Sequence, residues 1–193
     1  MPTIAAEDAR ITFKTLANGV KVKSLCRYSP EFSPMDAPEE STSIRIGALS
    51  GNDPTVLLVK VEIPQAPLGQ RMGSQDILEI SLECDSKSQP LHDLVPIQYT
   101  NSYSESMQLN KEVKDARLIW EINTCMTDLA NTKNPNQTQA ILDQAMTNAG
   151  TLGNQKITQE LKNMQDDLKK TGKLNDSNIT TTLTKTRNTG NLK

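Results

Sequence analysis

Histidine and aromatic side chains are scarce in this chain of 193 residues. It has one histidine, His92, together with one tryptophan, three tyrosines and two phenylalanines. A single imidazole cannot supply the paired histidines of a Cys₂His₂ zinc site, and no cysteine lies near it in the sequence. Long apolar runs are also missing, since no stretch approaches the roughly 20 apolar residues that cross a bilayer. We therefore expect neither a zinc centre nor contact with a membrane.

The three cysteines, Cys26, Cys84 and Cys125, are widely separated and form no C-x-x-C pair. An odd, sparse set of this kind is typical of thiols in a reducing compartment. The first residues lack the basic and apolar regions of a signal peptide, which also favours a cytoplasmic location. We expect the thiols to act as small, partly buried apolar groups. A nucleophilic Cys–His pair is the alternative, and it would have to use His92.

Motifs for common catalytic and binding sites are absent as well. The chain contains no G-x-G-x-x-G, no G-x-x-x-x-G-K-[ST] and no G-x-S-x-G. No aspartate begins the run Asp-x-Ser-x-Ser, and no twelve-residue Ca²⁺ loop can be written. We predict no catalytic, cofactor-binding or metal-ligating residue and no bound cofactor, so the chain is not expected to be an enzyme. A pair of carboxylates from distant parts of the sequence stays open as a catalytic alternative.

Charge is nearly balanced, with 21 basic and 23 acidic residues. This balance differs from the basic footprint of nucleic-acid-binding domains. Residues 154–193 are the exception, because they hold eight basic and four acidic side chains. We interpret them as a solvated helical face. Contact with nucleic acid, or docking on the acidic first half or on a partner protein, are the alternatives.

The first half of the chain has the pattern of short antiparallel strands. Nine of the ten prolines lie before residue 110, and the runs between them alternate apolar and polar residues. Strands are expected at 12–15, 20–23, 43–47, 56–63, 77–84 and 94–99. Asn18-Gly19 suits the tight turn of a hairpin between the first two, which would place Lys14 opposite Lys23. Pro96 limits the last strand to a sheet edge or a bulge.

From residue 110 onward the apolar spacing changes to that of helices. Helices are expected at 111–130, 138–149 and 154–171, with a weaker one near the C-terminus. Asn110 is a good N-cap for the first, and Gly150 and Gly172 are expected to end the next two. We predict that Trp120 anchors the first helix in the core, with Val113 on the same side. An exposed contact of Trp120 with a partner is the alternative.

Together the two patterns predict an α+β protein, an antiparallel β-sandwich followed by a C-terminal bundle of three to four helices. The change of period places the boundary near residue 109. We therefore expect a β-sandwich domain at 1–109 and a helical domain at 110–193.

The order of these segments resembles that of a known bacterial family. The runs 20–30, 43–49 and 56–64 are similar to the strands that follow the von Willebrand factor type A domain in bacterial, especially cyanobacterial, proteins. The run 110–113 resembles the junction to the helical tail of that region, and 168–174, Leu-Lys-Lys-Thr-Gly-Lys-Leu, resembles a pattern near its end. The A domain itself, with its metal-ligating serines and aspartates, is not in this chain, so no metal-site residue is carried over.

The resemblance implies a non-catalytic accessory module. Its sandwich would brace an A domain in the same or another chain, and its helices would offer a surface to partner proteins. Two alternatives stay open: an enzyme with a polar site in a cleft between sandwich and helices, and nucleic-acid contact through residues 154–193.

Overall fold

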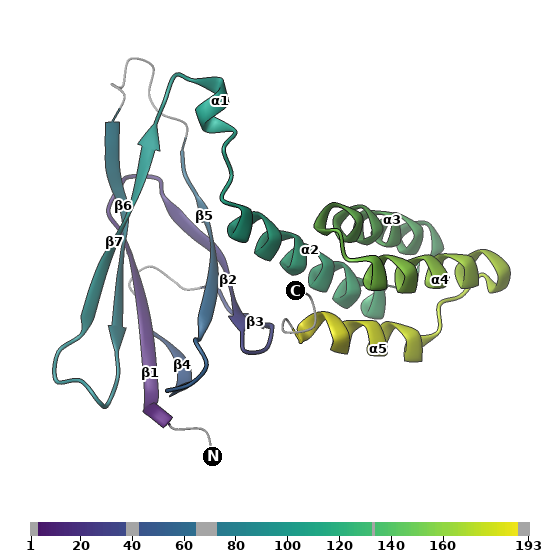
Figure 1. Cartoon of the computed structure of the whole chain (residues 1–193), viewed down its shortest axis with the longest axis horizontal. Helices are drawn as coiled ribbons and strands as arrows, with labels where there is room; N and C mark the ends of the chain where they lie inside the picture. Colours follow the sequence, from purple (N-terminus) through teal and green to yellow (C-terminus); the bar gives the residue numbers. More distant parts are fainter. Residues whose placement is uncertain (1–3, 38–42, 65–72, 133, 189–193) are drawn as a thin grey trace. The chain divides into compact units, whose positions relative to one another are not determined.

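The computed structural model describes residues 4–37, 43–64, 73–132 and 134–188. In these ranges the chain forms two antiparallel β-sheets and five helices (Figure 1). The predicted α+β class, a β-sandwich followed by a helical bundle, is confirmed. None of the described helices is both long and apolar enough to span a bilayer.

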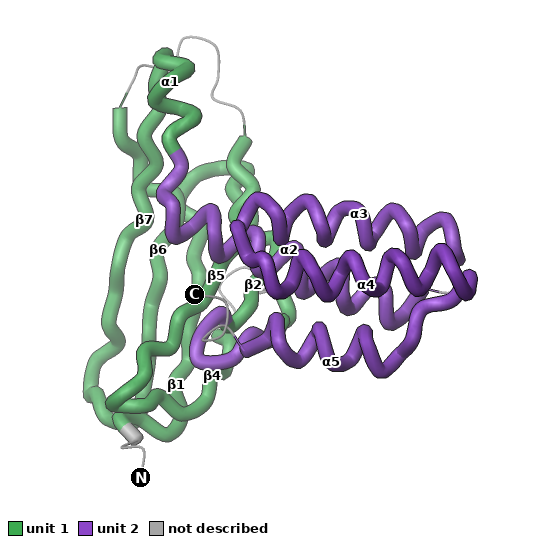
Figure 2. The backbone as a smooth tube through the Cα atoms, turned by 45° about the vertical axis from the view of Figure 1, so that its right-hand side comes forward, with its two compact units in different colours: residues 1–27, 34–108 green, residues 28–33, 109–193 purple. Residues whose placement is uncertain are grey.

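The chain divides into two compact units, which Figure 2 colours separately. The β unit comprises residues 1–27 and 34–108, and the helical unit comprises residues 28–33 and 109–193. The short segment 28–33 is tied into the helical unit, since the Phe32 amide donates to the Arg187 carbonyl over 2.8 Å and the Phe32 ring is buried. The sequence assigns this segment to the first domain. Separate folding of 1–109 and 110–193 stays a prediction.

The strands form one sheet of order β4-β1-β6-β7 and a second of order β3-β2-β5. Their bounds are β1 Ile4–Thr15, β2 Lys21–Ser29, β3 Ser33–Met35, β4 Ser43–Ser50, β5 Val56–Glu62, β6 Gly73–Glu83 and β7 Leu91–Tyr99. β7 lies at a sheet edge, and its register with β6 shifts next to Pro96. Both features agree with the restriction that Pro96 imposes on a strand.

The predicted hairpin between the first two strands is wrong. Asn18 and Gly19 do form a turn, in which the Val20 amide donates to the Ala17 carbonyl over 3.2 Å and Gly19 takes a φ of 79°. However, β1 pairs with β4 and β6, whereas β2 lies between β3 and β5. The turn therefore carries the chain from one sheet to the other.

Charge gives a physical reason for this outcome. The hairpin would have set Lys14 opposite Lys23, and directly opposed like charges destabilise a strand pair. In the structure Lys14 Nζ lies 3.2 Å from Glu79 Oε2 on β6, and Lys23 Nζ lies 3.0 Å from Glu62 Oε2 on β5. Each lysine thus lies beside a glutamate of the adjacent strand in its own sheet.

The core of the β unit follows from the alternation along β1. Ala9, Ile11 and Phe13 are buried, while Arg10 and Lys14 are exposed, as expected for a strand with one face toward the core. Phe13 is only 1% exposed and is the largest side chain of this cluster. Its other fully buried members come from both sheets and the turn before β2: Val20, Leu25, Ile46, Ile77 and Leu78.

The helices are α1 Tyr103–Ser106, α2 Lys111–Asn131, α3 Pro135–Leu152, α4 Gln155–Thr171 and α5 Asp176–Arg187. Asparagine is the N-cap of each of the last four, with its side-chain oxygen accepting from a first-turn amide: Asn110, Asn134, Asn154 and Asn175. Such a cap satisfies donors that a helix start leaves without an intrahelical partner. The predicted cap at Asn110 is confirmed, and α1 was not expected.

Gly153 and Gly172 end helices in the structure, whereas the sequence suggests Gly150 and Gly172. Gly172 closes α4 in the left-handed conformation, with φ 71°, as predicted. Gly150 does not stop α3, which continues to Leu152 and is closed by Gly153 with φ 77°. The left-handed cap lies just beyond the last helical turn and is usually a glycine. Gly150 lies within the helix, so it does not form the cap.

The core of the helical unit is built from α2, α3, α4 and α5. Ile122 and Met126 of α2 pack with Leu142 of α3 and with Leu161 and Met164 of α4, and each is at most 2% exposed. Further members of this cluster are Leu129, Ala145, Ala149, Ile157, Leu168 and Ile179.

Val113 was predicted to share the buried side of the first long helix, and this is wrong. Its side chain is 61% exposed, and the first buried residue of α2 is Ala116, at 5% exposure. Val113 lies in the first turn of α2, ahead of the part that packs into the core.

One buried polar pair joins α2 to α5. Asn123 is 1% exposed and Thr186 is 0% exposed. The Asn123 Nδ2 group donates to the Ile119 and Thr186 carbonyls over 3.0 and 3.2 Å, and the Thr186 hydroxyl lies 3.0 Å from Asn123 Oδ1. The buried Asn123 amide group therefore bonds backbone carbonyls of both helices, while the Thr186 hydroxyl lies within reach of both Asn123 Oδ1 and, at 2.9 Å, the Leu183 carbonyl.

Candidate functional site

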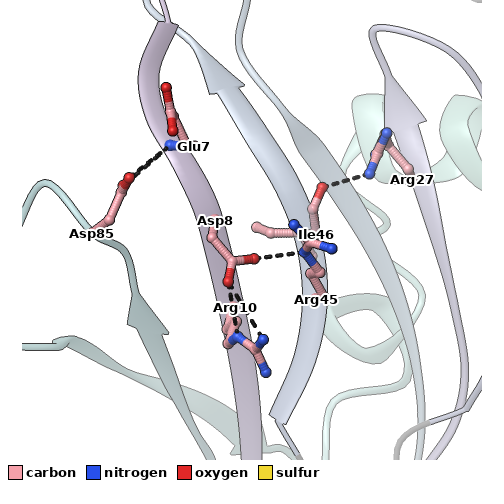
Figure 3. Close-up of polar contacts among 7 residues, drawn as sticks. All are labelled: Glu7, Asp8, Arg10, Arg27, Arg45, Ile46 and Asp85. Atoms are coloured by element: carbon pink, nitrogen blue, oxygen red, sulfur yellow. Dashed lines mark hydrogen bonds and ion pairs between the residues drawn. The ribbon is translucent and has the colours of Figure 1, made fainter.

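Charged side chains of β1 and β4 meet on the polar face of the first sheet (Figure 3). Arg45 Nε donates to Asp8 Oδ1 over 2.6 Å, and Arg10 Nε and Nη2 each lie 3.4 Å from Asp8 Oδ2. The hydrogen bond from Arg45, together with the charges of both arginines, holds the pKa of Asp8 below its usual value. Asp8 is therefore a permanently charged partner of two arginines and cannot serve as a proton donor near neutral pH.

A hollow of about 380 Å³ lies beside this cluster, at the turn between β6 and β7. Asp8, Arg10, Cys84 and Asp85 are among its lining residues. The Asp85 carboxylate accepts a hydrogen bond from the Glu7 amide over 3.1 Å (Figure 3). The charged lining is mixed, with acidic Asp8, Glu83 and Asp85 beside basic Arg10 and Lys87, so the hollow offers no field of one sign to a charged ligand.

His92, the one imidazole of the chain, contacts Ser81 and Glu79 across the β6–β7 pair. Ser81 Oγ lies 3.0 Å and Glu79 Oε1 lies 3.3 Å from the same ring atom, His92 Nδ1. A nucleophilic triad needs the hydroxyl and the carboxylate on opposite ring nitrogens. Here both lie near one nitrogen on an exposed strand face, so the group links two strands and lacks the arrangement of such a triad.

All three cysteines are free thiols. Burial raises the pKa of Cys26 to about 12, against a smaller opposing effect of a hydrogen bond with the Leu58 backbone. Burial also raises the pKa of Cys125, with help from the nearby charges of Asp128 and Glu121. A thiol with a raised pKa stays protonated near neutral pH and is a poor nucleophile. Cys26, at 0% exposure, therefore behaves as the small apolar group that the sequence suggests.

A smaller hollow of about 160 Å³ lies between α4 and α5 of the helical unit. Its charged groups are Glu160 and Lys185, whose Oε1 and Nζ atoms are 2.5 Å apart, and the Thr182 hydroxyl donates to Glu160 Oε2 over 3.3 Å. The charge of Glu160 is thus already satisfied. In the ranges that the structure describes, no three His, Cys, Asp or Glu side chains gather closely enough to hold a metal ion.

The basic residues that the structure describes in 154–188 are spread over α4, α5 and the loop between them. Lys169 and Lys170 lie in the last turn of α4 and are exposed. Cations at a helix C-terminus interact favourably with the helix dipole, which gives these two lysines a role within the helix itself. Lys185 is paired with Glu160. These placements favour the interpretation as a solvated helical face over a nucleic-acid surface.

Trp120 lies on α2 between the buried residues Ile119 and Ile122, but it is itself only partly buried and is not a member of the core cluster. Ile122 and Met126, at 1% and 0% exposure, fill the core from this helix. The two predicted roles of Trp120, packing anchor and partner contact, stay predictions.

The most exposed apolar side chains of the described ranges occur in one short stretch, residues 103–113. Tyr103 is 78% exposed, Met107 60%, Leu109 63% and Val113 61%. The first two belong to α1 and its C-cap, and the last two to the start of the helical unit. Each of these four side chains is thus left largely uncovered within its own unit, although large apolar groups are usually buried. The sequence shows these residues, but only the structure shows that they are not buried.

Comparison with known proteins gives a similarity of fold. No family model matches the sequence, and no curated protein matches it either. Among solved structures, "von Willebrand factor type A from Catenulispora acidiphila" is similar, with a TM-score of 0.68 and 13% sequence identity. The match covers 96% of this chain and 46% of that chain, so this chain spans less than half the length of its relative.

At this identity the match concerns the fold. The resemblance to von Willebrand factor type A proteins, noted in the sequence, is therefore supported by the fold. The finer assignment, to the region that follows an A domain, stays a prediction.

Proposed function

We propose that this chain is a non-catalytic protein-interaction module that binds and braces a von Willebrand factor type A domain, in the same chain or in another. The fold of nearly the whole chain is shared with less than half of a protein named for that domain. The sequence contains no Asp-x-Ser-x-Ser run, so a metal-dependent A-domain site would have to be supplied by the partner. The proposal includes a cytoplasmic location, in which three free thiols are stable.

The observation that carries the proposal is the exposure of the apolar stretch 103–113. Tyrosine is enriched among the residues that dominate binding energy at protein interfaces, because it combines a large apolar area with a polar end. Tyr103 and Met107 are four residues apart, and so are Leu109 and Val113. Tyr103 and Met107 lie at the start and the C-cap of the one-turn helix α1, whereas Leu109 precedes the N-cap of α2 and Val113 lies in the first turn of that helix.

The chemistry of the polar groups supports a non-catalytic role. Ser81 and Glu79 share one nitrogen of His92, Cys26 and Cys125 have raised pKa values, and Asp8 is held in its charged form. Of the hydroxyl and thiol groups named here, Ser81 is within reach of a base, and it shares that nitrogen with Glu79 in place of the two-sided arrangement of a triad. The hollows of both units are lined by residues of both charge signs, with Glu160 and Lys185 paired in one and Asp8 and Arg10 in the other.

Titration calorimetry with a purified A domain from the same organism tests the proposal. We expect saturable binding by the intact chain and at least about tenfold weaker binding by the double variant Tyr103→Ser/Leu109→Ser, since interface anchors commonly contribute 2 kcal/mol or more. Leu94→Ser is the matched control, because Leu94 is 50% exposed on β7 and lies outside the stretch. Absence of binding, or equal binding by the double variant and the control, would contradict the proposal.

A further inference from the structure

The turn between β1 and β2 presents an asparagine–glycine pair to solvent. Asn18 and Gly19 are both exposed, and they carry the chain from one sheet to the other. Gly19 has φ 79°, and since it has no Cβ, its backbone nitrogen is not shielded by a side chain. The hydrogen bond that closes the turn runs from the Val20 amide to the Ala17 carbonyl over 3.2 Å, which leaves the Gly19 amide outside it. A nucleophilic nitrogen and the carboxamide beside it therefore lie together in an exposed turn.

Other asparagines of the chain differ from Asn18 in their hydrogen bonding. Asn101 is also exposed, but the next residue, Ser102, has a side chain and its amide donates to the Thr100 hydroxyl over 3.0 Å. A hydrogen bond to a neutral acceptor opposes loss of the amide proton, and a Cβ crowds the approach to the nitrogen. Four further asparagines cap helices, with their side-chain oxygens accepting from first-turn amides: Asn110, Asn134, Asn154 and Asn175. Asn18 is thus distinguished by the residue that follows it and by the bonding of that residue's amide.

We propose that Asn18 is a site of spontaneous deamidation, with water as the co-reactant. The Gly19 nitrogen gives up its proton to solvent and bonds to Cγ of Asn18. The Cγ–Nδ2 bond breaks, and ammonia leaves with a proton taken from solvent. Water then opens the five-membered imide ring at Cγ, which gives aspartate, or at the main-chain carbonyl carbon of residue 18, which gives isoaspartate. One water is consumed and one ammonia is released, and nothing is oxidised or reduced.

Isoaspartate adds one methylene to the backbone of a turn that is held on both sides. Before the turn, the Leu16 amide donates to the Ile77 carbonyl of β6 over 2.9 Å. After it, Val20 is 5% exposed and belongs to the core of the β unit. Gly19 itself lies close to Pro64, since an added Cβ would lie 3.2 Å from Pro64 Cγ. A longer backbone between these points has to shift Val20 from the core or break the bond from Leu16, so the isoaspartate form is strained.

Peptide mapping of the full chain, incubated in the folded state at pH 8, tests the proposal. Trypsin cleaves after Lys14 and Lys21 and releases residues 15–21, in which Asn18 is the one asparagine. We expect this peptide to exchange its amide for an acid, a mass gain of about 1 Da, at a rate similar to that of the synthetic peptide 15–21. Asn101 should keep its amide over the same period. Retention of the amide at Asn18 while the synthetic peptide converts would overturn the proposal, and so would equally fast conversion of Asn101.

Asn18→Gln is the matched variant, because it keeps an amide in the turn but needs a six-membered ring to react. We expect this variant to convert at least about tenfold more slowly than the wild type, since ring closure depends on how the two groups are held. The wild type should also convert faster at pH 8 than at pH 6, because the attacking nitrogen first loses its proton. Conversion of the variant at the wild-type rate, or a rate independent of pH, would show that the Gly19 nitrogen takes no part.

Melting temperatures test the inferred strain of the turn. Asn18→Asp has the charge of the deamidated chain without the extra methylene, and it should melt like the wild type because residue 18 is exposed. The acidic fraction of aged wild type, with its isoaspartate measured by peptide mapping, should melt at least about 4 °C lower. An isoaspartate-rich fraction that melts like Asn18→Asp would contradict the strain. These outcomes are independent of A-domain binding, because the proposed A-domain surface is 103–113.

Discussion

The two units satisfy their backbone hydrogen bonds in different ways. Each long helix of the helical unit bonds within itself, and an asparagine caps its first turn. A strand of the β unit depends on its neighbours, so the order β3-β2-β5 leaves one edge of β5 without a partner strand among the described residues. The helical unit is thus complete in itself, while the β unit retains groups that can pair with another chain.

The units also differ in how they use polar side chains. In the helical unit the Asn123–Thr186 pair is buried and joins two helices. In the β unit the polar pairs lie on the exposed sheet face, as with Asp8 and Arg45. Exposed ion pairs contribute little to stability, whereas loss of one member of a buried pair leaves the other unsatisfied. The following substitutions test this contrast, beginning with the largest expected effect.

Removal of the main side chain from each core should destabilise one unit and spare the other. Phe13→Ala should cost the β unit about 3–5 kcal/mol, and Ile122→Ala should cost the helical unit about 2–5 kcal/mol. The single tryptophan, Trp120, lies on α2 and reports on the helical unit. Urea unfolding should therefore show a changed fluorescence transition for Ile122→Ala and an unchanged one for Phe13→Ala. A fluorescence transition that shifts equally in both variants would mean that the units unfold as one.

Loss of the buried hydroxyl should destabilise the helical unit by about 1–3 kcal/mol. Thr186→Val keeps the shape of the side chain but leaves Asn123 Oδ1 without the hydroxyl that lies 3.0 Å away. Thr184→Val is the control, since Thr184 is exposed on the same helix and its hydroxyl donates to the Thr180 carbonyl. Thermal unfolding of both variants measures the difference. Equal losses of stability in the two variants would show that the buried Thr186 hydroxyl stabilises the unit no more than the exposed Thr184 hydroxyl does.

Replacement of the turn glycine in the β unit should cost about 1–2 kcal/mol. Gly19 has φ 79°, and an added Cβ would lie 3.2 Å from Pro64 Cγ, so Gly19→Ala strains the backbone and crowds Pro64. Gly73→Ala is the matched control within β6, where no atom lies within 4 Å of the added carbon and φ is not in the left-handed region. Chemical unfolding followed by circular dichroism should separate the two. A neutral Gly19→Ala would contradict the turn geometry.

Alkaline pH should weaken the β unit slightly through Cys26. Its pKa in the folded chain is about 12, above the value of 9.0 for a free thiol. The stabilisation is therefore complete below about pH 9 and is lost as the pH rises toward 12, because the unfolded chain releases this proton first. Between pH 8 and pH 10 the wild type should lose about 1 kcal/mol more than Cys26→Ala. Identical pH dependence of the two proteins would show that Cys26 does not titrate as described.

The sequence predicts elements better than it predicts partners. The change of period near residue 110 identifies the strands and the helices, and the cap at Asn110 is confirmed because capping is a local interaction. The hairpin prediction fails because Asn18-Gly19 specifies a turn but not the sheet that the next strand enters. The prediction that Gly150 ends the helix also fails, because α3 continues past it to Leu152 and is closed by Gly153.

The candidate surface is harder to predict than the fold. Val113 has the spacing of a core residue on α2, and nothing in its neighbours shows that the first turn lies ahead of the packed part of the helix. Tyr103 lies in α1, a single turn whose cap, Ser102, accepts from the Glu105 amide. Exposure depends on what the rest of the chain covers, and that is a property of tertiary structure.

Hydrogen–deuterium exchange of the full chain, alone and saturated with an A domain from the same organism, tests the proposed function most directly. The account predicts slower exchange in 103–113 on binding, with exchange in α3 and α4 unchanged. Slower exchange confined to α3 and α4, or to the turn between β6 and β7, would show that the A domain contacts a surface other than 103–113. Unchanged exchange throughout the chain at saturating A domain would contradict the proposal that this protein binds such a domain.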